Sequence, residues 1–194
     1  MKRATAHLPI SPSKTLIGFA DQIASLNKGP IVDAPCGYGR NAFAFAARGC
    51  TVIAIDSDRK RLAALDQMKT VYLAKNAPGG INRGQIFTVC ADLTAEGWPV
   101  APSSASAIIC VHFEMIDLIP TFLSSLQEDG YLYIETFGGQ GQNFLELPKA
   151  GQLRQLLSRQ VEFRYYKERK VGPEEVNVVA VTLFAQRLGS SNGD

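Results

Sequence analysis

A glycine-rich segment, Asp33 to Asn41, contains the residues of this chain that are best suited to hold a ligand. It reads Asp-Ala-Pro-Cys-Gly-Tyr-Gly-Arg-Asn and follows a short apolar run. Gly37 and Gly39 let the backbone approach a ligand and adopt conformations that a side chain would block. A turn of this kind between a strand and a helix is the expected place for a bound nucleotide, so we expect a binding site here.

Three aspartates strengthen this expectation. Asp33 opens the glycine-rich segment, Asp56 stands 19 residues after Gly37, and Asp92 follows a further apolar run. At that spacing Asp56 can accept both hydroxyls of a ribose, and Asp92 can accept from an adenine amino group. Each aspartate alone is more often a turn or cap residue. Together, at the ends of successive predicted strands on one sheet edge, they favour a ligand site.

The elements that must position these residues alternate along the chain. Apolar, β-branched runs predict strands at 31–34, 51–55, 85–90, 107–113, 131–136, 161–169 and 176–187. Helical spacing predicts helices at 14–27, at 41–48, after a cap at Asp58, from about 118, and at 148–158. The stretch 94–104 is too short and too rich in proline and serine for a full helix.

Alternating strands and helices predict an α/β fold. We expect a Rossmann-like, mostly parallel sheet of seven strands with helices on both faces. The last two strands are joined by a direct turn at Gly172-Pro173, so one of them must be antiparallel.

Composition narrows the possible functions. The chain has 194 residues, 46% of them hydrophobic and 20% charged, with a net charge of +2. These values predict one soluble domain without the basic stripe typical of nucleic-acid enzymes. The four cysteines form no C-x-x-C pair, so we expect free thiols and no metal site. A signal peptide and a membrane span of about 20 apolar residues are absent from the sequence, which favours a cytoplasmic protein.

With these residues in place, the sequence resembles the class I S-adenosylmethionine-dependent methyltransferases. The resemblance covers residues 30–137 well and the C-terminal hairpin more loosely. The first family motif matches Asp33 and the run from Cys36 to Gly39. The following Arg40-Asn41 and the compact size are similar to the small bacterial branch that includes tellurite-resistance and thiopurine methyltransferases. Pro35 departs from the family, where many members carry glycine, and it removes one amide donor from the loop.

The resemblance implies a cofactor and the residues that bind it. The cofactor is S-adenosyl-L-methionine, with S-adenosyl-L-homocysteine as the product. The implied binding residues come from the first motif, the ribose acid with its neighbour, the adenine acid with its neighbour, and the end of the fourth strand. They are Asp33, Cys36, Gly37, Gly39, Asp56, Ser57, Asp92, Leu93, Val111 and His112.

The implied reaction is methyl transfer to an unidentified small-molecule acceptor by in-line displacement. Alignment and exclusion of water can supply much of the catalysis. A thiolate or soft anion needs no base, whereas a hydroxyl or ammonium nucleophile does. His112 and Glu135 are the candidate catalytic residues, followed by Glu114 and His7. A hydrogen-bonded structural histidine is an equally good interpretation of His112.

Cys36 follows a proline, as the nucleophile of cytosine-methylating enzymes does. In that family the pair lies after the fourth strand, so a packing or cofactor-adjacent cysteine is the better interpretation here.

Two other functions compete with a methyltransferase. A nicotinamide-dependent oxidoreductase is suggested by the relaxed dinucleotide fingerprint that starts at Gly37, by Asp56, and by Tyr166 and Lys170 at the spacing of a dehydrogenase dyad. That dyad needs a helix, and its segment has the pattern of a strand. A non-catalytic protein that keeps the fold and binds S-adenosylmethionine is the third possibility, since fold alone does not prove turnover.

The expected organisation is a single domain with short appendages. Residues 1–28 form an N-terminal lid or helix segment, 29–188 the methyltransferase domain, and 189–194 a disordered tail. Acceptor contacts are expected from the N-terminal segment and from the loops 113–120 and 137–148. The expected partner is a small molecule rather than nucleic acid or a membrane, and the expected state is a monomer or homodimer.

Overall fold

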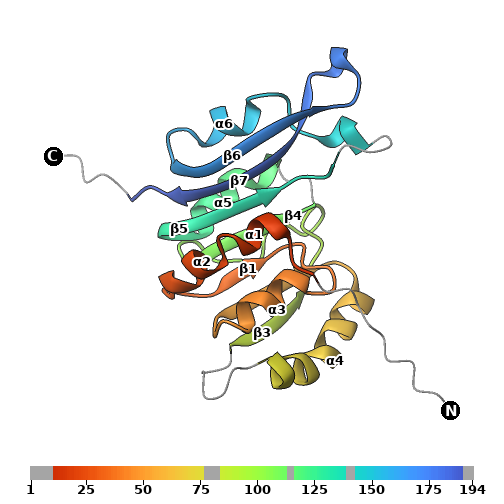
Figure 1. The fold of residues 1–194 in the computed structure, drawn as a ribbon, viewed down its shortest axis with the longest axis vertical. Helices are drawn as coiled ribbons and strands as arrows, with labels where there is room; N and C mark the ends of the chain where they lie inside the picture. Colours follow the sequence, from red (N-terminus) through yellow and green to blue (C-terminus); the bar gives the residue numbers. More distant parts are fainter. Residues whose placement is uncertain (1–10, 77–83, 113–115, 139–142, 190–194) are drawn as a thin grey trace.

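A computed structural model describes residues 11–76, 84–112, 116–138 and 143–189. They form an α/β fold around a seven-stranded sheet of order β3-β2-β1-β4-β5-β7-β6 (Figure 1). The strands are β1 (Ile31–Asp33), β2 (Thr51–Asp56), β3 (Gln85–Cys90), β4 (Ala105–Val111), β5 (Leu126–Glu135), β6 (Val161–Val171) and β7 (Val178–Arg187). β7 runs antiparallel to both of its neighbours, and the other neighbouring strands pair in parallel. This confirms the predicted fold class.

Helices cover both faces of the sheet (Figure 1). One face packs against α1 (Lys14–Ile17), α2 (Ala20–Leu26), α3 (Arg40–Ala46) and α4 (Arg59–Asn76), through buried residues such as Leu16, Phe43 and Leu62. The other face packs against α5 (Ile119–Ser125) and α6 (Gln152–Leu157), through residues such as Phe122 and Leu157. Short 3-10 turns lie at η1 (Ile116–Leu118), η2 (Asn143–Glu146) and η3 (Glu174–Val176). The central parallel strands β1 and β4 are therefore buried on both sides, as their continuous apolar runs require, whereas the edge strand β3 is partly exposed.

The strand register brings the predicted site residues to one edge. Asp33 at the end of β1 pairs with Ala54 of β2 and with Ile109 of β4. Two residues further along each neighbour come Asp56 and Val111, and Val111 pairs with Glu135 at the end of β5. The carboxyl ends of β1, β2, β4 and β5 thus meet at a common edge, which is where α/β sheets bind ligands.

Several predicted boundaries were wrong. The single helix predicted at 14–27 is two helices, because Gly18 ends α1 and the Phe19 ring turns inward to stack on Phe184 at a centroid distance of 4.4 Å. The β5 strand starts at Leu126 rather than 131. The predicted turn at Asp129 and Gly130 lies within the strand, where Asp129 takes a left-handed conformation. The helix predicted from 148 begins at Gln152. β4 covers residues 105–111 rather than 107–113.

Other local predictions were confirmed. Asp58 caps α4, since its carboxylate accepts from the backbone amides of Lys60 and Arg61. The stretch between β3 and β4 forms a turn with no helix. From this stretch Trp98 packs on Phe122 at a centroid distance of 4.6 Å, and its indole donates to the Ser125 hydroxyl at 2.9 Å. No helix in the described part of the chain is long and apolar enough to cross a membrane.

Candidate active site

The turn between β1 and α3, residues 34–39, is here called the glycine loop. Gly37 and Gly39 lie in it with φ of +55° and +80°, and the Ala34–Pro35 peptide is cis. A left-handed backbone favours glycine at both positions. The conformation therefore explains why the sequence places two glycines in this turn.

The two glycines differ in what surrounds them. A side chain at Gly39 would begin 2.5 Å from the Leu65 Cδ1 atom, so close packing of the loop on α4 requires this glycine. A side chain at Gly37 would meet no atom of the described residues within 4 Å. Gly37 therefore borders open space, and a ligand can approach the backbone there.

Asp33 lies fully buried beneath the glycine loop. Its Oδ2 atom accepts the Ala42 amide at 3.0 Å, whereas its Oδ1 atom has no hydrogen-bond partner among the described residues. Burial raises the pKa of Asp33 to about 7, against the lowering effects of the Ala42 amide and of the nearby Asn41 side chain. A buried carboxylate oxygen without a partner is costly. It would be satisfied by a ligand cation such as the ammonium group of an amino acid.

Asp56, at the end of the neighbouring strand β2, accepts a hydrogen bond from the glycine loop. It is 3% exposed, and its Oδ2 accepts the Gly37 amide at 2.8 Å while its Oδ1 accepts the Asp58 amide at 2.9 Å. A carboxylate oxygen can accept two hydrogen bonds, so one lone pair on each atom remains for a ribose. The ribose contact stays a prediction, while the contact to Gly37 links the predicted acid directly to the predicted loop.

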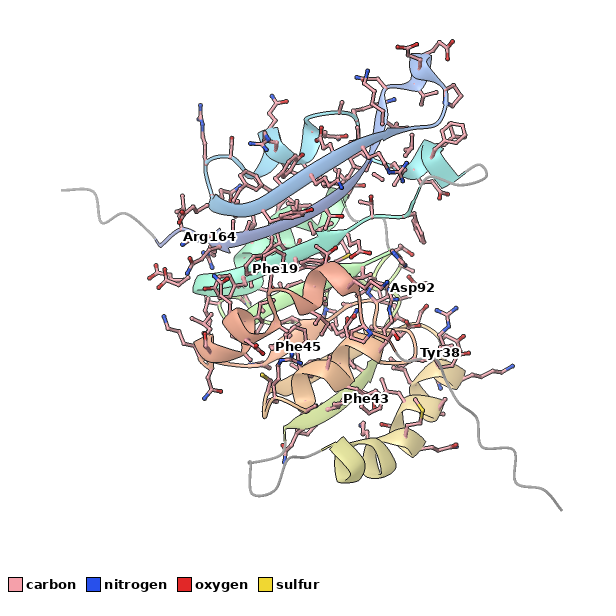
Figure 2. All side chains as sticks on the ribbon, in the orientation of Figure 1. Phe19, Tyr38, Phe43, Phe45, Asp92 and Arg164 are labelled. Atoms are coloured by element: carbon pink, nitrogen blue, oxygen red, sulfur yellow. The ribbon has the colours of Figure 1, made fainter. Side chains whose placement is uncertain are left out.

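Asp92 closes a turn after β3. Its Oδ1 accepts the Thr94 hydroxyl at 2.6 Å, the Thr94 amide at 2.9 Å and the Ala95 amide at 3.2 Å. These hydrogen bonds, the hydroxyl first, hold the pKa of Asp92 below its ordinary value. Figure 2 shows Asp92 and Tyr38 of the glycine loop toward the same side of the molecule. An adenine contact from Asp92 stays a prediction.

The other predicted binding residues have different surroundings. Cys36, Leu93 and Val111 are buried in the two cores, and Ser57 is exposed after β2. Burial, and then the charges of Asp33 and Asp56, raise the pKa of Cys36, so its thiol stays protonated. A protonated buried thiol agrees with a packing residue rather than a nucleophile. Cofactor contacts from these four residues stay predictions.

A second group of polar side chains, here called the strand-end cluster, consists of Ser13, Asn41, His112, Tyr133 and Glu135. Glu135 is its centre. The Ser13 hydroxyl donates to Glu135 Oε2 at 2.5 Å and the Tyr133 hydroxyl donates to the same atom at 2.7 Å. His112 Nε2 lies 3.4 Å from Glu135 Oε1, and the His112 amide donates to the Glu135 carbonyl at 2.6 Å. The structure thus brings the two predicted catalytic residues together.

The strand-end cluster also connects to the glycine loop. The Ser13 amide donates to Asn41 Oδ1 at 3.2 Å, and the Asn41 side chain lies close enough to Asp33 to lower the pKa of that carboxyl. A chain of contacts therefore runs from Asp33 to His112, through Asn41, Ser13 and Glu135. The segment before α1 lies between the two groups, in agreement with an N-terminal contribution to the site. Residues 1–10, with His7, lie outside the described residues, as do Glu114 and residues 190–194 of the predicted tail.

The carboxylate of Glu135 is ionised. Burial alone would raise its pKa, but hydrogen bonds from His112, Ser13 and Tyr133, together with the electrostatic effect of His112, lower the pKa to about 2. Burial raises the pKa of Tyr133, and the contacts with Glu135 raise it further. The Tyr133 hydroxyl therefore stays protonated and donates its hydrogen bond. The strand-end cluster therefore holds one negative charge at neutral pH on Glu135, beside an imidazole.

Sequence reasoning missed Ser13, Asn41 and Tyr133. Ser13 is recognisable as a helix cap, because its hydroxyl accepts the Leu16 amide at 3.3 Å. Its contact with Glu135 spans 122 positions in the chain and leaves no local signal. Tyr133 and Asn41 are buried, and in the sequence they resemble ordinary strand and helix residues.

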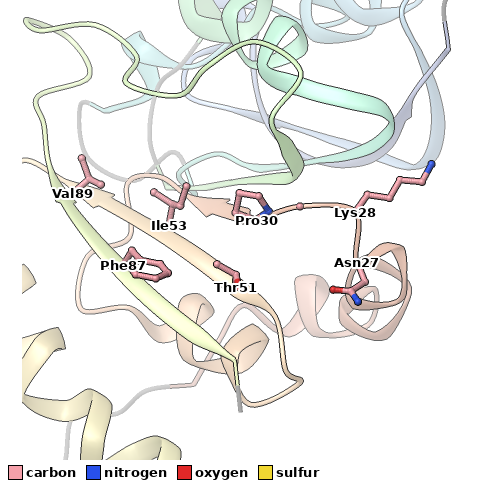
Figure 3. A pocket seen from close by; sticks show the side chains of 8 residues that line it. Asn27, Lys28, Pro30, Thr51, Ile53, Phe87 and Val89 are labelled. Atoms are coloured by element: carbon pink, nitrogen blue, oxygen red, sulfur yellow. The ribbon is translucent and has the colours of Figure 1, made fainter. Parts of the chain in front are cut away.

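A hollow of about 570 Å³ lies away from this edge (Figure 3). Pro30, just before β1, and Thr51, at the start of β2, line it together with Ile53, Phe87 and Val89. Pro30 and Thr51 lie at the amino ends of β1 and β2, opposite to Asp33 and Asp56, and the hollow extends from there along β2 and β3 to Val89. We therefore assign the candidate site to the polar strand edge and not to this apolar hollow.

The structure bears on the competing oxidoreductase function. Tyr166 and Lys170 lie on β6, an edge strand, and not on the helix that a dehydrogenase dyad needs.

Among the described residues, no three His, Cys, Asp or Glu side chains lie close enough together to hold a metal ion.

The fold is that of the S-adenosylmethionine-dependent methyltransferases. A methyltransferase from Methanosarcina mazei superposes with a TM-score of 0.54 at 16% identity, covering 84% of this chain and 93% of that one. TehB from Haemophilus influenzae superposes with a TM-score of 0.56 at 18% identity, covering 88% of this chain and 60% of TehB. A tRNA (m1A58) methyltransferase from Aquifex aeolicus superposes with a TM-score of 0.54 at 15% identity, covering 88% and 68% of the two chains.

No protein-family model and no curated protein matches the sequence. The likeness to solved structures is therefore one of fold.

Proposed function

We propose that this chain is an S-adenosylmethionine-dependent methyltransferase of the small bacterial type that includes tellurite-resistance and thiopurine methyltransferases, and that its acceptor is a small molecule. The observation that carries the proposal is the open space at Gly37. Two acidic side chains accompany it: Asp33, whose Oδ1 has no hydrogen-bond partner among the described residues, and Asp56, whose Oδ2 accepts the Gly37 amide. A cofactor with an ammonium group, a sulfonium and a ribose matches these three features in charge and in hydrogen bonding.

The residues of the chain have separable tasks in this proposal. Asp33 would accept the ammonium of the methionine part, the backbone at Gly37 would lie against it, and Asp56 would take the ribose. Asp92 would lie toward the adenine. When bound, the cofactor supplies an electrophilic methyl group, so the chain itself has to orient the acceptor and exclude water.

A small-molecule acceptor is supported by charge. The net charge of +2 offers little of the electrostatic attraction that nucleic-acid binding requires. Because a neighbour in fold methylates tRNA, the acceptor has to be tested against tRNA directly.

Heat stabilisation tests the cofactor. S-adenosylhomocysteine at 100 times its dissociation constant should stabilise the protein by about 2.7 kcal/mol, and NAD or NADP should not. Stabilisation by a nicotinamide cofactor alone would overturn the proposal. Transfer of label from methyl-labelled cofactor then separates an enzyme from a binding protein. Faster labelling of tRNA than of every small thiol, amine or acid would contradict the acceptor class.

A further inference from the structure

The strand-end cluster holds His112 at the carboxyl end of β4, beside the end of β5. The side chain of His112 is 47% exposed, its ring stacks near Phe137 at a centroid distance of 5.9 Å, and Glu135 contacts both its ring and its amide. His112 also has a φ of +61°, a conformation that costs free energy for a residue other than glycine. One side of the imidazole is therefore anchored while much of the side chain faces solvent at the strand edge.

The partners of Glu135 are divided between its two oxygens. Ser13 and Tyr133 both donate to Oε2, which leaves Oε1 facing the imidazole. A carboxylate that is ionised and held in this way orients a histidine and stabilises the imidazolium that forms when the ring takes a proton. Ser13 and Tyr133 do not face the acceptor in this arrangement, so they act through Glu135.

We propose that His112 and Glu135 form a proton-accepting pair and that the acceptor is therefore a hydroxyl or an amine, with Ser13 and Tyr133 as positioning residues. This inference rests on the proposed methyl transfer and specifies its substrate class. A thiolate, carboxylate or inorganic oxyanion carries no proton to remove, so a proton-accepting pair would not assist its methylation.

The reaction balances without any further reactant. The O–H or N–H bond of the acceptor breaks and its proton passes to the imidazole of His112. The electron pair left on oxygen or nitrogen forms a bond to the methyl carbon, and the carbon–sulfur bond breaks with its electron pair staying on sulfur. His112 then releases the proton to solvent.

The charged groups around the pair are few among the described residues. Glu135 contacts the imidazole, Tyr133 donates to Glu135, and Asp33 lies beyond Asn41. The Arg169 guanidinium donates to the Gly138 carbonyl at 2.8 Å, next to Phe137. Replacing Glu135 therefore removes the negative charge that touches the ring.

The first test needs no acceptor. The chain has two histidines, so His7→Gln leaves His112 as the only one. In that background, diethyl pyrocarbonate should modify His112, and the rate of modification at a fixed pH should change severalfold when Glu135→Gln removes the carboxylate that contacts the ring. An unreactive His112, or a rate that Glu135→Gln leaves unchanged, would overturn the pair.

The second test compares acceptors that share one aromatic body: phenol, benzylamine, thiophenol and benzoate. Labelled methyl should pass to phenol or benzylamine at least 10-fold faster than to the other two, and the reverse order would overturn the inference. On the faster probe, Ser13→Ala should lower kcat about 10-fold with KM and cofactor affinity unchanged, a split that a merely structural serine would not give, and Ser13→Thr should restore kcat. Ser158→Ala, at an exposed serine whose hydroxyl donates to the Gln155 carbonyl, is the matched control.

Cofactor binding separates this inference from the proposed function. If S-adenosylhomocysteine fails to bind, the proposed function fails whatever His112 does. If it binds equally well to the parent and to Glu135→Gln while the rate of His112 modification stays unchanged, the proton-accepting pair alone is wrong.

Discussion

The two halves of the candidate site are built in different ways. The half after β1 and β2 consists of the glycine loop and two aspartates, Asp33 and Asp56, whose oxygens accept backbone amides of the loop and of the adjoining β1–α3 and β2–α4 segments. The half after β4 and β5 consists of side chains that bond mainly to one another, and Ser13 lies 122 positions from its central residue, Glu135. Backbone contacts make the first half rigid by local folding, whereas the second half forms only when the whole domain has folded.

This difference predicts where substitutions act. Changes in the first half should alter the free energy of unfolding or the affinity for cofactor. Changes in the second half should leave cofactor affinity intact and alter the acceptor side. Four predictions test whether the two halves act separately, and they follow from the largest expected effect to the smallest.

Asp33 should make stability depend strongly on pH. Its pKa is raised to about 7 by burial, so the folded protein keeps a proton that the unfolded chain releases above about pH 4. The stability contributed by this proton is present below pH 4 and is lost as pH rises through 7, up to about 4 kcal/mol. Urea unfolding from pH 4 to 8 should show this decline in the parent and a flatter profile in Asp33→Asn. Parallel profiles would contradict the buried protonated state.

The two glycines should respond differently to the same change. Gly39→Ala places a methyl group against Leu65 and should lower the free energy of unfolding by about 3 kcal/mol. Gly37→Ala meets no protein atom and should cost only about 1–2 kcal/mol for its positive φ. It should nevertheless bind S-adenosylhomocysteine at least 10-fold more weakly in calorimetry. Normal affinity in Gly37→Ala would mean that the open space serves another purpose.

Asp56→Ala should weaken cofactor binding by about 1–3 kcal/mol, or roughly 5- to 150-fold, through lost hydrogen bonds to the ribose. It also removes the acceptor of the Gly37 amide, so stability has to be measured alongside affinity. Asp58→Ala, which removes the cap of α4 two residues away, is the control for a merely local effect. Equal cofactor affinity in the parent and in Asp56→Ala would show that Asp56 does not bind the ribose.

Tyr133→Phe should have the smallest effect. It removes one neutral donor from Glu135 and keeps the buried ring, at a cost of about 1 kcal/mol in the free energy of unfolding. Cofactor affinity should stay within twofold of the parent. A large loss of affinity would show that the two halves are coupled more tightly than their separate construction suggests.

The same contrast explains what the sequence could predict. Strands, helices and the glycine loop depend on periodicity and on residues close together in the chain, and most of them lie where the pattern placed them. Asp56 was predicted at the loop from its spacing, and it contacts Gly37. The end of α1 at Gly18 was not predicted, because Phe19 packs on Phe184, a residue far along the chain. Ser13 and Tyr133 were missed for the same reason, since their partners are set by tertiary packing.

The turn that replaces a helix between β3 and β4 determines what can be observed by fluorescence. It contains the only tryptophan of the chain, Trp98, which packs on Phe122 in the core opposite α1–α4. Emission from Trp98 will follow unfolding of that core and will remain nearly constant when ligand enters the polar strand edge. A binding titration read from native emission would then appear flat even with saturated protein. Replacing Tyr38 of the glycine loop by tryptophan in a Trp98→Phe background would move the fluorophore to the edge where binding is expected.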